Sequence, residues 1–275
     1  MPTSINNRVT GSAIATGIAG CIAGAVAVED PVTRLLIDVG TNSEVLLSHQ
    51  GRLYACSAPA GPAFEGGEIS QGMLALPGAV FEVSDNFELS VVGGGQPKGI
   101  CGSGIVDTIA ALLRAGVLDE NGLMRAEQPF ADRIIHETDG SLKFMLAPGL
   151  FLTQKDIRAV QLAKGALRCA VDALLDEAGA VASQIDAVYL AGAFGTSLRV
   201  ENALEIGLVP PIAPARVKQV GNGAIQGAKA ILLSACAKAE AERLAKAIRH
   251  VDLASLEDFQ DRFLASLSFG PGLGR

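Results

Sequence analysis

The stretch from Leu35 to Leu47 holds the residues whose types and spacing could bind a phosphate together with a metal ion. Asp38 ends a short apolar run, and Gly40, Thr41 and Asn42 then form a tight polar turn. Such a turn can direct backbone N–H groups and a hydroxyl at an anion while the carboxylate faces a metal. This chemistry suits a nucleotide phosphate with Mg²⁺, whereas the alternative is an ordinary hairpin whose polar residues only stabilise the turn.

The elements around this turn are predicted to be strands. Leu35–Ile37 is a continuous apolar run, as in a strand covered on both faces, and Val45–Leu47 is a second strand that completes a hairpin. Arg52–Ser57 reads as a third strand. The loop that follows is rich in small residues and carries two carboxylates, Glu65 and Glu68.

A glycine-rich turn opens the first predicted helix. Residues 73–83 and 87–92 look extended, and Cys101–Gly104 then precedes apolar residues at helical spacing. Gly116 is expected to close this helix. The N–H groups at such a helix start can bind an anion, although glycine also permits simple close packing.

A long amphipathic helix is predicted to begin after Thr153. The sequence Thr153-Gln-Lys-Asp has the form of a capping box, and the apolar positions that follow share one face until about Gly179. Gln161 and Lys164 lie among these apolar positions and are expected to be solvated.

The last third of the chain alternates strands, glycine turns and helices. Val188–Ala191 is a short buried strand, Gly192–Gly195 is a sharp turn, and Val200–Ile206 is a short helix. Val220–Ala224 is expected to open a long helix that runs to about Ile248. Strands joined by turns in the first part of the chain, followed by strand–turn–helix units, predict an α/β fold with a mixed sheet.

Composition excludes several classes of function. The 275 residues are 49% apolar and 19% charged, which is typical of a globular protein. A net charge of -7, 4% aromatic residues and no Trp argue against a nucleic-acid binder. The five cysteines are scattered singly, so the spacing predicts no iron–sulfur or zinc site and favours buried thiols in a reducing cytoplasm.

One uncharged segment near the start of the chain bears on membranes and on assembly. Residues 11–28 carry no charge and contain Gly20-x-x-x-Gly24, a packing motif of transmembrane helices. Because the segment is mostly Ala and Gly, its drive to insert into a membrane is weak. We expect a closely packed helix, no membrane span, and a homodimer in which this surface is covered.

Three glycine-rich turns stand in the order of a known ATPase fold: Asp38-Val-Gly-Thr-Asn, Leu190-Ala-Gly-Ala-Phe-Gly and Val220-Gly-Asn-Gly-Ala. Together they resemble the second half of the actin-like, sugar-kinase and heat-shock-chaperone ATPases. The chain is most similar to the carboxy-terminal region of the reductive activators of corrinoid proteins. The stretches that carry this resemblance lie between Leu35 and Phe269, and are LLIDVGTNSEVLL, AGPAFEGGEISQGM, ICGSGIVD, TQKDIRAVQLAKGA, YLAGAFG, IGLVP and VGNGAIQGA.

The resemblance implies a fold and a set of site residues. The fold would be a ribonuclease-H-like, actin/chaperone-type ATPase lobe with a mixed sheet flanked by helices, binding ATP and Mg²⁺. Asp38 would orient the metal through water. The residues implied to bind the nucleotide are Gly40, Thr41, Asn42, Gly102, Ser103, Gly104, Gly192, Ala193 and Gly195, with Asp38 beside them. Catalytic candidates are Glu44, Glu65 and Glu68, and none is singled out as a general base.

The resemblance covers only the last part of full-length activators. Those proteins carry a ferredoxin domain and a first ATPase lobe, whereas this chain has about thirty residues before Leu35. Residues 1–30 would be a remnant helix of that lobe, 31–269 the second lobe, and 270–275 a frayed tail. Ala193 also stands where many members of the wider fold have a second glycine.

The expected function is the nucleotide-binding lobe of an ATP-dependent activator that serves a corrinoid (methyltransferase) protein. A separate chain could supply the ferredoxin and the first lobe, and this chain would hold no iron–sulfur cluster. Since it holds half of the expected cleft, its ATPase activity is left open. The alternatives are a non-catalytic docking or assembly module, one part of a split ATPase, and a small-molecule kinase, for which no substrate signature is present.

Overall fold

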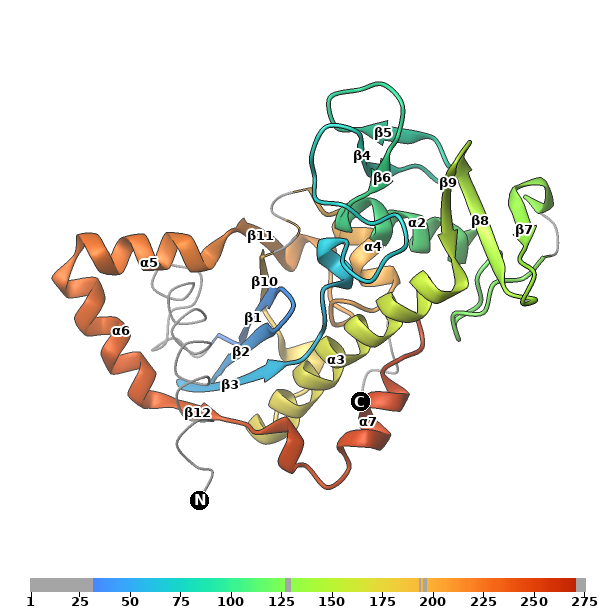
Figure 1. The fold of residues 1–275 in the computed structure, drawn as a ribbon. Helices are drawn as coiled ribbons and strands as arrows, with labels where there is room; N and C mark the ends of the chain where they lie inside the picture. The colour runs from blue at the N-terminus through green and yellow to red at the C-terminus, as the bar shows by residue number, and fades with distance from the viewer. Residues whose placement is uncertain (1–31, 127–129, 193, 195–196, 271–275) are drawn as a thin grey trace, which may run out of the picture.

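The computed structural model describes residues 32–126, 130–192, 194 and 197–270, and these form a mixed sheet with a smaller part beside it (Figure 1). The sheet has the strand order β11-β10-β1-β2-β3-β12. Strands β10 and β11 run parallel to β1, and β12 pairs in parallel with β3. Strand β2 is antiparallel to both of its neighbours, β1 and β3. The strands are β1 (Arg34–Val39), β2 (Ser43–His49), β3 (Arg52–Ala58), β10 (Ala187–Gly192), β11 (Val217–Gly221) and β12 (Ile248–His250).

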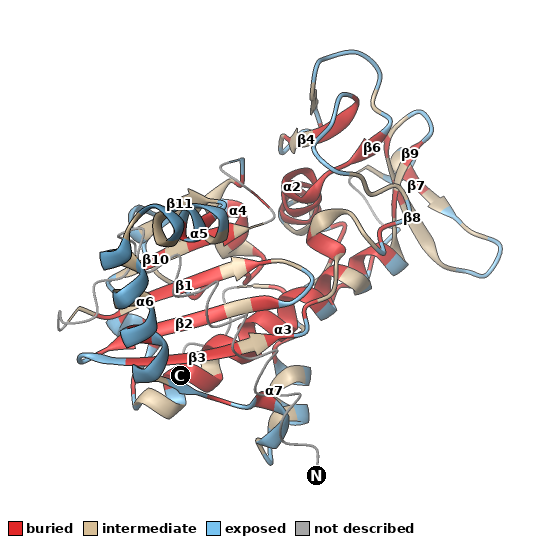
Figure 2. Ribbon diagram, turned by 60° about the vertical axis from the view of Figure 1, so that its left-hand side comes forward, coloured by how far each residue is buried: buried red, intermediate tan, exposed pale blue. Residues whose placement is uncertain are grey.

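Both faces of this sheet are covered, as the apolar run of β1 predicts. Leu35 and Ile37 belong to the large core that includes helix α3 (Gln154–Ala178). The alternate residue Leu36 lies in a smaller cluster with Leu244 of α6 (Ala235–Ala247). Helix α5 (Gly223–Leu233) precedes α6, and Figure 2 shows the buried strands with the largely exposed α5 and α6 beside them.

The smaller part is built from two three-stranded sheets around helix α2 (Gly102–Arg114). A short 3-10 helix, η2 (Ala63–Glu65), leads into it from β3. Helix α3 begins in this part and extends beneath the large sheet (Figure 1). The strands are β4 (Ala79–Val83), β5 (Leu89–Val91), β6 (Gly99–Ile100), β7 (Ile134–His136), β8 (Leu142–Ala147) and β9 (Leu150–Thr153).

The capping box predicted at the start of α3 is confirmed. Thr153 Oγ1 accepts from the Asp156 amide, and the Asp156 carboxylate accepts from the Thr153 amide at 2.8 Å. The same buried carboxylate accepts from the backbone amide of Ser70 at 2.7 Å. Asp156 therefore joins the start of α3 to the loop that follows η2. Gly179 closes the helix in the left-handed conformation, as expected.

Two side chains expected to be solvated are buried instead. Gln161 is 3% exposed and Lys164 is 1% exposed, because the end of the chain folds over this face of α3. Gln161 donates to the carbonyl of Leu267 at 3.1 Å, and Lys164 donates to the carbonyl of Ser268. The prediction failed because helical spacing identifies a face but not the distant segment that covers it.

Several element boundaries also differ from those predicted. Residues 73–78 form a loop, and β4 begins only after Gly78, which has a φ of +98°. The long helix expected up to Ile248 is broken at Ser234, whose backbone is extended and whose hydroxyl accepts from the Ala237 amide as the N-cap of α6. Val220 and Gly221 end β11 (Val217–Gly221), and the predicted helix begins within the expected stretch, at Gly223 of α5 after the N-cap Asn222. The last helix of the described residues is α7 (Phe259–Ala265).

The cysteines of the described residues are unpaired, and three of them are buried: Cys56, Cys101 and Cys169. Cys236 is exposed on α6, contrary to the prediction that every cysteine is a buried thiol. Within the part of the chain that the structure describes, no helix is long and apolar enough to cross a membrane. Residues 11–28, with Gly20, Gly24 and Cys21, lie outside the described residues, as do 271–275.

Candidate functional site

The predicted hairpin is present, and its turn is closed by Ser43. The Gly40 amide donates to Ser43 Oγ at 3.1 Å, and the Ser43 hydroxyl donates to the Gly40 carbonyl at 2.8 Å. Ser43 is buried, whereas Thr41 and Asn42 are exposed at the tip of the turn. The turn is therefore held from within by Ser43, which leaves the two predicted phosphate-binding residues open to a ligand.

Asp38 and Glu44 are directly opposite each other on β1 and β2. Burial raises the pKa of Asp38 to about 6. Burial, and then the charge of Asp38, raise the pKa of Glu44 to about 7. Among the described residues, no hydrogen-bond donor reaches the Asp38 carboxylate. A half-buried carboxylate without a donor and beside a second carboxylate fits a divalent cation, which would relieve both charges.

Gly192 brings the end of β10 against Asp38. Its φ is +91°, and a Cβ added there would lie 2.2 Å from the Val39 carbonyl oxygen and 2.5 Å from Asp38 Oδ1. Only glycine fits this position, so the turn after β10 begins beside the predicted metal-binding carboxylate. Ala193 and Gly195 of the same turn lie outside the described residues.

The loop between β3 and η2 is bound to the tip of the hairpin turn. The Gly61 amide donates to the Thr41 carbonyl at 2.9 Å, and the Thr41 hydroxyl donates to Glu65 Oε2 at 2.5 Å. Glu68 is exposed, and no hydrogen bond to the turn involves it among the described residues. Of the three candidate catalytic carboxylates, Glu65 therefore contacts the phosphate turn, Glu44 faces Asp38, and Glu68 does neither.

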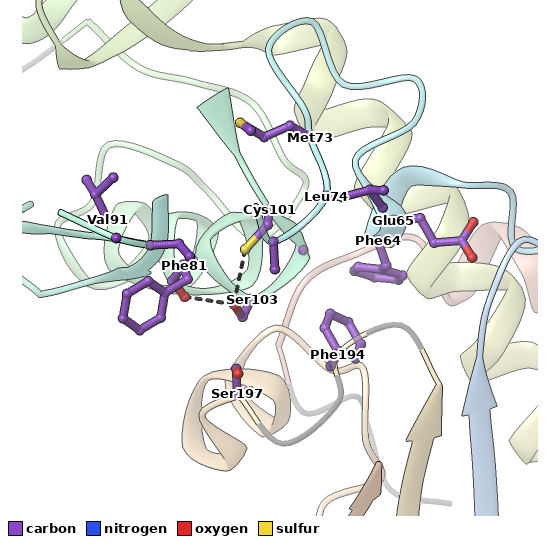
Figure 3. Close-up of a pocket in the computed structure, with 14 residues that line it drawn as sticks. Phe64, Glu65, Met73, Leu74, Phe81, Val91, Cys101, Ser103, Phe194 and Ser197 are labelled. Atoms are coloured by element: carbon purple, nitrogen blue, oxygen red, sulfur yellow. Dashed lines mark hydrogen bonds between the residues drawn. The ribbon is translucent and has the colours of Figure 1, made fainter. Parts of the chain in front are cut away.

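A cavity of about 590 Å³ lies on the other side of Phe64 and Glu65, at the start of α2. The rings of Phe64 and Phe194 lie 5.3 Å apart with an interplanar angle of 59°. Figure 3 shows these rings facing each other, with the Glu65 carboxylate pointing away from Phe81 and Val91. The lining residues are Phe64, Glu65, Met73, Leu74, Ala75, Phe81, Val91, Val92, Gly93, Cys101, Gly102, Ser103, Phe194 and Ser197.

The three predicted residues at the start of α2 do different things. Gly102 lines the cavity, and a Cβ there would lie 2.1 Å from the Phe64 carbonyl oxygen. Ser103 also lines it, but its hydroxyl donates to the Phe81 carbonyl at 2.7 Å. Gly104 instead packs on β4, where a Cβ would lie 2.4 Å from the Val80 carbonyl oxygen. The glycines thus serve close packing, while the first amides of the helix have no acceptor within it.

The turn after β10 is fixed on both sides. The side chain of Gln219 on β11 bonds to both the amide and the carbonyl of Leu198. Arg199 donates from Nε to both oxygens of Asp107, which is 1% exposed on α2, and Asn202 of α4 (Val200–Glu205) donates to Asp107 at 2.6 Å. This pairing of a buried carboxylate with a partly exposed guanidinium joins the turn to the smaller part, so it positions Phe194 and Ser197 at the cavity.

Phe64 and Phe194 are the site residues that sequence reasoning missed. Each is the single aromatic residue in a stretch of small residues, Ala60–Glu68 and Ala191–Gly195. That isolation was a usable signal, because a lone aromatic among glycines has no local partner. The pairing of the two rings depends on the tertiary fold, since 130 positions in the numbering separate residues 64 and 194.

Comparisons with known proteins agree on one group of relatives. Residues 32–271 match the family described as the C-terminal domain of RACo, the ASKHA domain. The chain is 32% identical over 289 aligned residues to the corrinoid activation enzyme RamQ of Eubacterium limosum, covering 98% of this chain and 49% of that protein. It is 29% identical to the [Co(II) methylated amine-specific corrinoid protein] reductase of Methanosarcina barkeri, covering 87% of this chain and 46% of that protein.

A solved structure agrees with these sequence relatives. The reductive activator for corrinoid, iron–sulfur protein superposes with a TM-score of 0.83 and 34% sequence identity, over 94% of this chain and 42% of that chain. The actin-like ATPase fold expected from the glycine turns is thereby confirmed. The chain spans about half the length of the relatives that it matches.

The raised pKa of Glu44 makes a prediction about stability. Because its folded pKa is about 7, above the ordinary 4.5, its protonated form stabilises the fold at low pH, and this stabilisation is lost as the pH rises toward 7. The free energy of unfolding of Glu44→Gln, taken relative to that of the parent, should therefore rise by about 1 kcal/mol between pH 5.5 and pH 8. This figure is discounted for partial exposure.

Urea unfolding in EDTA at the two pH values would measure this difference. Glu88→Gln is the matched control, because Glu88 is exposed and lies on the smaller part. A difference between Glu44→Gln and the parent that does not change with pH would contradict the proposed burial of this charge.

Proposed function

The chain belongs to the family of the C-terminal ASKHA domain of the reductive activators of corrinoid proteins, and from that premise we propose that it is the nucleotide-binding lobe of an ATP-dependent activator. In this proposal ATP binding and closure around the nucleotide assist the reductive activation of a corrinoid methyltransferase component. The relatives support the corrinoid part, because their names specify corrinoid activation and corrinoid protein reduction. The fold supports the nucleotide part.

The single observation that carries the nucleotide site is the convergence of the hairpin turn, the glycine-rich start of α2 and the turn after β10 around Phe64 and Glu65. The hairpin turn reaches Glu65 through Thr41, and the start of α2 packs on the Phe64 carbonyl. The turn after β10 brings Phe194 onto the Phe64 ring. We assign the phosphates to the hairpin turn and the nucleoside to the cavity beside the aromatic pair, with Gly192 on the adenosine side.

The metal assignment rests on Asp38. Among the described residues, no group of three or more His, Cys, Asp or Glu side chains could hold a metal by itself. Mg²⁺ does not need such a group, because it usually keeps several waters and takes one or two carboxylates together with substrate phosphates. Bound Mg²⁺ would neutralise phosphate charge beside Gly40, Thr41 and Asn42. Asp38, half-buried and without a donor among the described residues, supports this assignment.

The reductive step and the closed cleft would need further parts. We propose that a ferredoxin domain and a first ATPase lobe act together with this lobe, and that the lobe itself holds no iron–sulfur cluster. Three buried, unpaired cysteines are consistent with a reducing cytoplasm. Iron analysis after anaerobic purification should find well below one equivalent per chain.

The first test of this proposal is the affinity for ATP. Asp38→Ala should weaken binding of ATP in the presence of Mg²⁺ by at least tenfold, because it removes the metal-facing carboxylate at the phosphate turn. Isothermal titration of parent and variant would measure the two affinities.

Circular dichroism should show the same helix and strand content for both proteins, since the substitution removes a buried charge and no hydrogen bond of the described residues. Asp261→Ala on the exposed side of α7 is the matched control. Equal affinity for Asp38→Ala and the parent would remove Asp38 from the site. A parent that binds no ATP would favour the docking module instead.

A second expectation concerns assembly. Residues 11–28 are uncharged and apolar, and a surface of this kind left open would exceed the usual apolar patch of a monomer. We expect a homodimer at micromolar concentration, with Gly20→Leu weakening the pairing. Light scattering over a wide concentration range would measure the mass, and a clean monomer throughout would reject the dimer.

A further inference from the structure

We propose that Glu65 makes phosphate binding at the hairpin turn depend on a bound divalent cation, an inference that rests on the nucleotide-binding role proposed above. Glu65 thereby acts as a specificity-determining residue: it admits the Mg²⁺ complex of a nucleoside polyphosphate and disfavours the metal-free polyphosphate. Three features of the described residues carry this role, namely a hydrogen bond, a position and a charge balance.

The hydrogen bond uses the hydroxyl proton of Thr41, the only hydrogen-bond donor of that side chain. A hydroxyl has one donor and two acceptor lone pairs, and Thr41 donates its proton to Glu65 Oε2. An ionised phosphate oxygen can only accept. While the Glu65 bond is intact, Thr41 therefore presents lone pairs to the turn, which suit a cation or its water and not a phosphate oxygen.

The position of Glu65 places its charge against the turn itself. Its second oxygen, Oε1, lies 3.8 Å from the point where a Cβ on Gly40 would be. Neighbouring contacts hold the residue there, because Gly61 bonds to the Thr41 carbonyl and Phe64 is 2% exposed beneath the start of α2. The carboxylate is thus fixed beside the backbone that would receive the phosphate.

The charge balance around the turn is negative. Asp38, Glu44 and Glu65 lie in or beside it, and among the described residues none of the ion pairs involves any of them. A metal-free polyphosphate would meet these carboxylates, whose charges no ion pair among the described residues offsets. A fixed unit charge several ångströms away, near a protein surface, changes the affinity for an anion by roughly tenfold.

The test compares Glu65→Gln with the parent in the binding of ATP. The glutamine keeps an acceptor for the Thr41 hydroxyl and removes the charge. Isothermal titration with ATP and Mg²⁺, and again with ATP and EDTA, gives for each protein the ratio of the two dissociation constants. We expect Glu65→Gln to reduce this ratio by roughly tenfold, mainly through tighter binding of metal-free ATP.

Two further variants separate charge from structure. Glu68→Gln removes a charge from the same loop without touching Thr41 and should leave the ratio within twofold of the parent. Glu65→Ala removes both the charge and the acceptor, so a merely structural role would weaken both affinities in Glu65→Ala and leave Glu65→Gln like the parent.

Three outcomes would overturn the role of Glu65, and one of them would also reject the proposed function. A parent that binds ATP with a ratio unchanged in Glu65→Gln overturns the role of Glu65 and leaves the proposed function standing. An equal reduction in Glu68→Gln also overturns it, because any nearby charge would then suffice. A parent that binds ATP in neither condition rejects the proposed function and this inference together.

Discussion

The contact on which the site depends is the seating of Phe64 and Glu65 between the hairpin and helix α2. Phe64 is buried, and its carbonyl packs where only a glycine at position 102 leaves room. Its ring meets Phe194, while the next residue, Glu65, accepts the Thr41 proton. Two adjacent residues thus join the large sheet, the smaller part and the turn after β10. A site assembled from separate segments needs such a junction, because each turn alone is only a local bend.

The electrostatics of the site are set by burial and by two neighbouring carboxylates that form no ion pair among the described residues. Asp38 and Glu44 share one side of the hairpin, where burial raises the pKa of each. Burial of these two carboxylates disfavours their charged forms. Perturbed pKa values of this kind are usual at positions that bind ligands rather than stabilise the core. Under the proposed function a cation bound with the nucleotide would offset both charges.

The pairing of the buried Asp107 with the partly exposed Arg199 has a positional role. Replacing a buried ion pair with apolar residues is often neutral for stability, so such a pair is weak grounds for a stability argument. Here it fixes the segment that begins at Phe194 to α2, while Gln219 fixes the same segment to the sheet. The cavity is therefore bounded by elements that cannot shift independently without breaking polar contacts.

Local chemistry in the sequence determined the hairpin, the capped start of α3, the helix start at Cys101 and the order of the three glycine turns. These features depend on neighbours within a few positions, so periodicity and turn residues suffice to predict them. The resemblance carried by those turns also identified the family, which the comparisons confirm. Tertiary structure alone decided which residues meet. The burial of Lys164 under residues 266–269, the pairing of Phe64 with Phe194 and the bond from Thr41 to Glu65 join segments separated in the chain. No local pattern encodes such contacts, because they form only when the whole sheet brings its loops to one edge.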